Sequence, residues 1–303
     1  MNLATLLTES RNSASEAIDT LSTEAMLHVF NDEDRTVAER VREQIPQIAQ
    51  AVDAVAERVR QGGRLFYAGA GTSGRLGVLD ASECPPTFGV PRDLVQGFLA
   101  GGDPALRVSA ESVEDSREQG GIDLLANGFN QSPGMDTLVG IAASGRTPYV
   151  LGAMEQARQH GCLTIGLSCV PGSAVATASD IAITPATGAE VITGSTRMKA
   201  GTATKLVLNM LSTGLMVKLG YVYGNLMTNV QTTNVKLVDR AERIVIAATG
   251  VAPHRAAELL REGGKVSTAI VMHRLGVSRA DAEAALAANA GNLRRTLGET
   301  STL

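Results

Sequence analysis

The glycine-rich stretch at residues 69–74 (GAGTSG) constrains the fold of this 303-residue chain more than any other feature. An apolar run at residues 65–67 leads into it, and a helical pattern follows it. In a strand–turn–helix unit of this kind, glycines allow close backbone approach, and the helix start presents free N–H groups and a positive dipole end. The stretch therefore predicts a site for an anion.

Two common nucleotide loops do not fit this stretch. No Gly-Lys-Ser/Thr follows, which excludes a Walker A loop. The glycine spacing matches the dinucleotide fingerprint, but no acidic residue ends a second strand about 20 residues on. The hydroxyls of Thr72 and Ser73 instead suit a phosphate monoester held without metal, with Gly71 and Gly74 as neighbours. The alternative is a tight turn without a ligand.

Composition and charge exclude several classes of partner. The chain has 27 basic and 31 acidic residues and no tryptophan, so neither a basic field nor aromatic stacking favours nucleic acid. No apolar run reaches membrane-spanning length, and the charged N-terminus does not resemble a signal peptide. Three cysteines without CxxC spacing favour a reducing compartment. We expect a cytoplasmic protein with no membrane partner.

Apolar runs alternate with helical patterns along the chain. Strands are expected at 65–67, 94–100, 136–143, 163–168 and 181–184. This alternation predicts an α/β fold with a doubly wound, mostly parallel five-stranded sheet.

Three helix boundaries are predicted from local signals. Pro46 should kink or split the helix that begins near residue 34. The helix after residue 74 should stop at Pro85-Pro86, and an acidic helix at 106–118 should end at Gly120-Gly121.

The triplet Ser-Gly-Arg occurs at 73–75 and again at 144–146, each time directly after an expected strand. Neighbouring strand ends converge at the switch point of a doubly wound sheet. We therefore expect Ser144, Gly145 and Thr147 to bind the same anion as Ser73. A third stretch of small residues, at 188–204, leads into another helix.

The expected domains are an N-terminal arm at 1–33, a main domain at 34–249 and a small helical domain at 250–303. A helix is expected at 232–249 in the main domain, and short helices at 254–262, 267–274, 279–288 and 291–297 in the last domain. An appendage of this size is close to the lower limit for independent folding.

Five segments, in order along the chain, resemble the N-acetylmuramic acid 6-phosphate etherases of the sugar isomerase (SIS) superfamily. They are GAGTSGRLG, ASECPPTFG, the stretch at 110–115 (AESVED), AASGRTPYV and TGSTRMKAGTATK. The resemblance implies an SIS fold and a lyase, without metal or cofactor, that removes D-lactate from a phosphorylated amino sugar. It also implies a homodimer with active sites at or near the interface. Ala142 departs from the superfamily's Ser-x-Ser-Gly-x-Thr loop, in which a serine stands first.

The resemblance also assigns roles to residues. Glu83 is the general acid and Glu114 the base that removes the C2 proton. From sequence alone Glu114 is not separable from Glu111, Asp115 and Glu118, and a solvated acidic stripe is the alternative.

The third stretch carries four candidate substrate-binding residues. Either Arg197 or Lys199 is expected to bind the lactyl carboxylate. Ser195 and Thr196 join the substrate site or only start the helix. The histidines show no HxH or HExxH spacing, so no metal is expected.

Two other functions stay open. One is a non-catalytic sugar-phosphate-binding regulator like the glucokinase regulatory proteins, which would be favoured if counterparts of Glu83 and Glu114 were missing. The other is a sugar-phosphate-responsive transcription regulator, which would need a basic helix-turn-helix that residues 1–60 do not resemble.

Overall fold

The computed structural model describes residues 7–108, 112–230 and 235–299. By contacts the chain forms two compact units. The first holds the residues up to Ser82 together with Asp93–Ser212, and the second holds Glu83–Arg92 and the residues from Thr213 onward. Contacts do not measure independent folding, so the predicted boundaries at 33/34 and 249/250 stay predictions.

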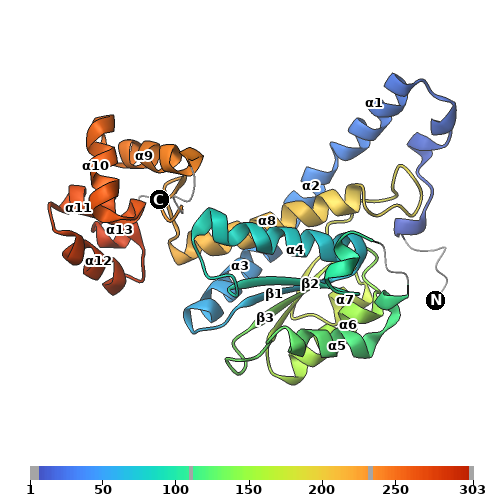
Figure 1. The fold of residues 1–303 in the computed structure, drawn as a ribbon. Helices are drawn as coiled ribbons and strands as arrows, with labels where there is room; N and C mark the ends of the chain where they lie inside the picture. Colours follow the sequence, from blue (N-terminus) through green and yellow to red (C-terminus); the bar gives the residue numbers. More distant parts are fainter. Residues whose placement is uncertain (1–6, 109–111, 231–234, 300–303) are drawn as a thin grey trace. The chain divides into compact units, whose positions relative to one another are not determined.

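A five-stranded parallel sheet forms the centre of the first unit (Figure 1). Its strands are β1 (Leu65–Gly69), β2 (Val95–Leu99), β3 (Thr137–Ile141), β4 (Leu163–Leu167) and β5 (Ile181–Ile183). All pairs are parallel and the order is β2-β1-β3-β4-β5. The predicted doubly wound sheet is confirmed, with each strand inside or next to its expected range.

The two faces of the sheet follow the alternation of side chains along each strand. Phe66 and Leu138 belong to one buried cluster with residues of α5 (Arg117–Ala126) and α6 (Pro148–Gln159), which cover that face. Tyr67 points the other way, toward α4 (Gly71–Phe88), where its hydroxyl donates to Asp80 at 3.0 Å. Strands buried on both faces explain the nearly continuous apolar runs in the sequence.

Proline acts differently at the two predicted helix boundaries. Pro46 lies in the first turn of α3 (Ile45–Arg60), which follows the separate helix α2 (Val37–Arg42), so the predicted split is confirmed. The predicted stop at Pro85-Pro86 is wrong, because α4 continues to Phe88. Each proline removes the hydrogen bond that its own N–H would make, and α4 ends within three residues of Pro85.

The predicted acidic helix at 106–118 is also wrong. Short 3₁₀ turns, η5 (Asp103–Leu106) and η6 (Val113–Asp115), occupy this region, and α5 begins only at Arg117. Gly120 and Gly121 lie inside α5 rather than at its end. A Cβ on Gly120 would lie 1.9 Å from the carbonyl oxygen of Tyr149, so this glycine permits close packing of α5 against α6.

The remaining elements of the first unit complete its surface. They are η2 (Leu7–Glu9), η3 (Ser13–Ser15), η4 (Ile18–Thr20), α1 (Thr23–Asp34), α7 (Ala174–Thr177) and most of α8 (Lys199–Leu219).

The second unit is a helical body with its own core. Its elements beyond the ends of α4 and α8 are β6 (Val222–Tyr223), β7 (Leu226–Met227), α9 (Val235–Thr249), α10 (Pro253–Gly263), α11 (Val266–Leu275), α12 (Arg279–Ala288) and α13 (Leu293–Thr296). The five helices expected between 232 and 297 are confirmed, although 232–234 lie outside the described residues. In the described part of the chain, no helix has the length and apolar content to cross a membrane.

Candidate functional site

The candidate site begins at the switch point of the sheet. The chain leaves β1 for β2 on one side and enters β3 on the other side of β1. In the register, Gly69 at the end of β1 lies beside Ile141 at the end of β3. The two Ser-Gly-Arg loops therefore start at the same level of adjacent strands, as predicted, at the position where such sheets bind ligands.

The loop after β1 turns tightly into α4. A Cβ on Gly74 would lie 2.4 Å from the Cβ of Leu99 and 2.8 Å from the carbonyl oxygen of Gly69, so only glycine fits. Gly71 has a φ of 52°, in the left-handed region that favours glycine. The first N–H groups of α4 have no partner within the helix, and Thr72 and Ser73 beside them are partly exposed.

The loop after β3 is fixed by its neighbours. Gly145 has a φ of 68°, its carbonyl accepts from the N–H of Val175 at 2.9 Å, and a Cβ there would lie 2.1 Å from Oγ of Ser173. Thr147 precedes α6 without capping it through its side chain. Ser144 and Thr147 are both partly exposed at this rigid turn.

Six predicted hydroxyl residues share one property. None of their side chains forms a hydrogen bond within the described ranges 7–108, 112–230 and 235–299: Thr72, Ser73, Ser144, Thr147, Ser195 and Thr196. Other hydroxyls of the same unit vary: that of Thr204 donates to the carbonyl of Ala200 at 2.8 Å, whereas those of Thr8 and Thr137 are buried without a partner among the described residues. Unbonded donors gathered at a switch point are what a phosphate would need.

A cavity of about 590 Å³ adjoins the second loop. Ser144, Arg146, Ser173 and Arg117 are among its lining residues. Arg117 also forms an ion pair with Glu155 at 2.6 Å. The volume is in the range of small-molecule sites, and the arginines favour an anionic ligand.

The third stretch ends at the start of α8, close to the first loop. A Cβ on Gly201 would lie 3.6 Å from the side-chain methyl of Thr72. The first N–H groups of α8 are already satisfied, because the buried carboxylate of Glu190 accepts from Lys199 and Ala200 at 2.9 Å each. The helix start itself is therefore occupied by the protein's own carboxylate.

Lys199 is almost completely buried and its ammonium forms an ion pair with Glu33 of α1. Asn12 also donates to Glu33, at 2.8 Å. Burial acts to raise the pKa of Glu33, but the hydrogen bonds from Lys199 and Asn12 outweigh it and hold this pKa below its ordinary value. Arg197, in contrast, is exposed and forms no ion pair with any residue that the structure describes.

The two predicted catalytic glutamates are both exposed. Glu114 lies in η6, where the neighbouring Val113 packs against the core cluster and η6 contacts α6. Arg75 donates to the carbonyls of Ala105 and Leu106 at 2.8–3.1 Å and so ties the preceding segment to α4.

Glu83 lies near the end of α4 and belongs to the second unit, whereas Glu114 belongs to the first. The competing residue Glu111 lies outside the described residues. The other two competitors are exposed. Asp115 follows Glu114 within η6, whereas Glu118 belongs to the separate helix α5.

Sequence reasoning missed two residues that support the site, Glu33 and Glu190, and it missed the contacts of Arg75. Glu33 and Lys199 are 166 positions apart, and Glu190 lies nine positions before the N–H of Lys199, beyond any capping-box spacing. The Ser-Gly-Arg repeat did single out Arg75, but its partners are carbonyls that no local pattern marks.

The three cysteines lie in the protein core. Cys84, Cys162 and Cys169 are buried and free, and burial raises the pKa of Cys162 to about 11 and that of Cys169 to about 12. Cys84 is only 2% exposed and is a small core residue. Among the described residues, no group of three or more His, Cys, Asp or Glu side chains could hold a metal ion.

The first unit is thus that of an α/β protein with a doubly wound parallel sheet and two glycine–hydroxyl loops at its switch point. Residues 47–158 match the family model of the glucokinase regulatory protein N-terminal SIS domain. The solved structure of a phosphoheptose isomerase from Francisella tularensis has a similar fold, with a TM-score of 0.51 and 19% identity over 65% of this chain and 100% of that one.

Relatives that match over nearly their full length are more similar in sequence than this isomerase structure. The N-acetylmuramic acid 6-phosphate etherases of Salmonella agona (strain SL483) and Salmonella typhi are each 52% identical over 298 residues, which is 98% of this chain and 99% of each relative. The chain belongs to the N-acetylmuramic acid 6-phosphate etherase family.

Proposed function

We propose that this chain is a carbon–oxygen lyase that cleaves the D-lactyl ether of N-acetylmuramate 6-phosphate and yields N-acetylglucosamine 6-phosphate and D-lactate. The observation that carries the proposal is the group of unbonded hydroxyls at the switch point, in a chain 52% identical to etherases over 298 residues. Ser73, Ser144 and Thr147, with the N–H groups of their loops, hold the 6-phosphate. Its place is in cell-wall sugar recycling in the cytoplasm, where buried free cysteines stay reduced.

The chemistry is elimination followed by hydration. Ring opening gives an aldehyde, which makes the C2–H bond acidic enough for Glu114 to remove the proton. The C3–O bond then breaks, and the lactate oxygen takes the electron pair and a proton from Glu83. Water adds its hydroxyl to C3 and returns a proton to Glu83, while Glu114 returns a proton to C2. Each acid–base transfer is typically worth 10²–10⁴-fold.

Arg197 is the residue we assign to the lactyl carboxylate. It is exposed and has no ion-pair partner among the residues described, whereas Lys199 is buried against Glu33. A guanidinium fork matches a carboxylate in two parallel hydrogen bonds. Lys199 then acts as a positioning residue for the start of α8. Ser195 and Thr196, with unbonded hydroxyls, complete the substrate site.

The chain acts as a homodimer in this proposal, with each active site at or near the interface. Helix α4 is continuous through Gly74 and Glu83, and nine residue steps of helix cover about 13 Å. That length exceeds the reach from the 6-phosphate of a hexose to its C3. Glu83 therefore serves the phosphate site of the partner subunit.

Subunit mixing tests the dimer. A Glu83→Gln chain of low kcat mixed with a Ser144→Ala chain of raised KM should, at a substrate concentration below KM, give more activity than the sum of the two chains alone, because some heterodimers hold one complete site. Subunit exchange is confirmed by mass spectrometry of differently tagged chains. If exchange occurs and activity does not exceed that sum, both groups belong to one chain's site.

Isotope labelling tests the reaction. Turnover in D₂O should place deuterium at C2 of N-acetylglucosamine 6-phosphate, and turnover in ¹⁸O-water should label the C3 hydroxyl and leave lactate unlabelled. A C2-deuterated substrate checks for a shielded base through its primary isotope effect. Unlabelled C2 together with no isotope effect would leave the role assigned to Glu114 without support. Binding of the phosphosugar without any turnover would favour a regulatory protein.

A further inference from the structure

The second unit contains a cavity of about 830 Å³ that the proposed reaction does not use. It lies at the start of α11, and the residues important for its chemistry are Gly264, Lys265, Ser267, Thr268, Arg279 and Glu283. Its volume is large enough for a sugar phosphate.

Two buried residues with hydroxyl side chains, Ser267 and Thr268, line this cavity. The exposed fraction is 5% for Ser267 and 1% for Thr268. Neither side chain makes a hydrogen bond to any of the residues that the structure describes. Both hydroxyls are therefore able to donate to a ligand in the cavity.

The backbone at the same place also presents donors. Lys265 is the N-cap residue of α11, with extended backbone (φ −135°, ψ 151°) and no side-chain cap hydrogen bond. The first N–H groups of this ten-residue helix are therefore not capped by a side chain. Their free N–H bonds and the positive dipole end favour an anion.

The charge of the lining points the same way. The exposed Lys265 forms no ion pair within the described parts of the chain. Arg279 donates to Glu283 at 2.8 Å. The guanidinium of Arg279 also lies close to Gly264, because a Cβ on Gly264 would be 3.3 Å from it. The lining thus holds two cations, Lys265 and Arg279, and one carboxylate, Glu283. Gly264 has a φ of 72° and no side chain, so the arginine can approach the turn closely.

We infer that this cavity is a second anion site of the chain and that it binds a phosphate monoester. Two hydroxyls, a helix start and a lysine provide the donors that the phosphate oxygens require, and the remaining volume accommodates the organic part of the ligand. The inference does not depend on the proposed reaction, because none of the residues assigned to that reaction lines the cavity.

Amide chemical shifts of the full-length protein test the site directly. Inorganic phosphate, titrated at constant pH and ionic strength, should give saturable shifts at the N–H groups of Val266, Ser267 and Thr268. The dissociation constant should rise at least about tenfold in Lys265→Gln and in Thr268→Val, since each removes one hydrogen bond to a charged group. Thr268→Ser keeps the hydroxyl and should retain binding.

The controls separate this site from the switch point. Lys236→Gln, which removes an exposed lysine of α9 outside the cavity, should leave the α11 response unchanged. Ser144→Ala should also leave it unchanged, even if the proposed etherase activity proves absent. No saturable shift at α11, or equal shifts in wild type, Lys265→Gln and Thr268→Val, would overturn the inference.

Two further titrations distinguish the source of the phosphate. N-acetylglucosamine 6-phosphate should bind more tightly than inorganic phosphate if the sugar fills the remaining cavity, and unphosphorylated N-acetylglucosamine should not bind. A response to the unphosphorylated sugar equal to that of the phosphosugar would show a carbohydrate site and contradict an anion site.

Discussion

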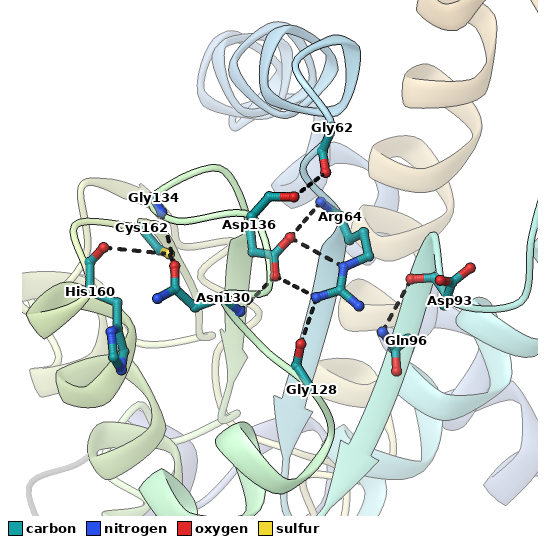
Figure 2. Close-up of polar contacts among 11 residues, drawn as sticks. Gly62, Arg64, Asp93, Gln96, Gly128, Asn130, Gly134, Asp136, His160 and Cys162 are labelled. Carbon is teal, nitrogen blue, oxygen red and sulfur yellow. Dashed lines mark hydrogen bonds and ion pairs between the residues drawn. The ribbon is translucent and has the colours of Figure 1, made fainter.

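The two edges of the same sheet differ in how completely their polar groups are bonded. At the amino edge, Asp136 accepts from the N–H of Arg64 at 2.8 Å, from its guanidinium at 2.8 Å and from the N–H of Asn130 at 2.7 Å (Figure 2). At the carboxyl edge, the hydroxyls of Ser73 and Ser144 bond to no described residue. Polar groups with complete bonding hold the strands together, and those without are available to a ligand.

Burial explains why the pair of Asp136 and Arg64 must be fully bonded. Asp136 is fully buried and the side chain of Arg64 is only 12% exposed. The guanidinium also donates to the carbonyl of Gly128 at 2.6 Å. A buried ion pair costs several kcal/mol in lost hydration unless every lone pair and proton is matched. The hydroxyls at the carboxyl edge are partly exposed, so water satisfies them until a ligand arrives.

The largest expected effect is on catalysis. Glu114→Gln and Glu83→Gln should each lower kcat by at least about 10²-fold, since each removes a proton-transfer group. Both side chains are exposed, so the unfolding free energy should change little. Steady-state assays of lactate release and urea unfolding measure the two quantities.

Glu118→Gln is the matched control for Glu114. It removes an exposed glutamate from the first turn of α5 and should keep near-wild-type activity. Equal damage from Glu118→Gln and Glu114→Gln would show that the choice between the two is wrong.

The next effect is on stability at the amino edge. Asp136→Asn should lower the free energy of unfolding by about 3 kcal/mol, because the change leaves the charge of Arg64 buried without its partner. The activity of the folded fraction should stay near wild type. Asp32→Asn, which breaks an exposed pair with Arg35, should cost less than about 0.5 kcal/mol. A strong loss of activity in folded Asp136→Asn protein would contradict a purely structural role for the pair at the amino edge.

The sequence predicted the sheet better than the helix ends, for a physical reason. Strands buried on both faces produce apolar runs that are visible locally. Gly120-Gly121 looks like a helix stop, but the glycines serve the contact of α5 with α6, and only the assembled structure contains that contact. Pro85-Pro86 marks the approach of an end, and the helix still continues to Phe88.

The same limit applies to the site. Hydroxyls next to glycine turns after strands are local signals, and the register of β1 with β3 places them together as predicted. The pairing of Glu33 with Lys199 depends on how α1 packs near the start of α8. A sequence pattern identifies residues able to bind charge, whereas only packing reveals which of them are already bonded.

A smaller effect is expected at the carboxyl edge. Ser144→Ala should raise KM about tenfold and change kcat less, because it removes one hydrogen bond to a charged phosphate. Ser179→Ala is the matched control, since its hydroxyl already donates to the carbonyl of Ala176 at 2.8 Å, and it should leave KM unchanged. If the loss in unfolding free energy of Ser144→Ala is as large as the loss in binding free energy that its raised KM represents, the hydroxyl has a structural role and does not bind the ligand directly.

The smallest expected effect is on stability, and it concerns the ion pair of Glu33 and Lys199. Glu33 and Lys199 lie near the start of α8, yet their bonding is as complete as that of the amino edge. The comparison therefore predicts a structural role. Glu33→Gln should lower the free energy of unfolding by about 1 kcal/mol at pH 7, with little change in kcat/KM. Asp34→Asn, which neutralises the exposed neighbour on α1, should change neither.

The pH dependence of this difference gives the sharper test. Hydrogen bonds from Lys199 and Asn12 hold the pKa of Glu33 below its ordinary value of 4.5 against the opposing effect of burial. A group with a depressed folded pKa stabilises the fold fully above its unfolded pKa and loses that contribution as pH falls through the folded value. The stability gap between wild type and Glu33→Gln should therefore be constant from pH 7 to about 5.5 and shrink below pH 4.5. A gap that persists at low pH would mean that the glutamine is poorly packed, and a fall in kcat/KM without a stability gap would place Glu33 with the ligand-binding groups.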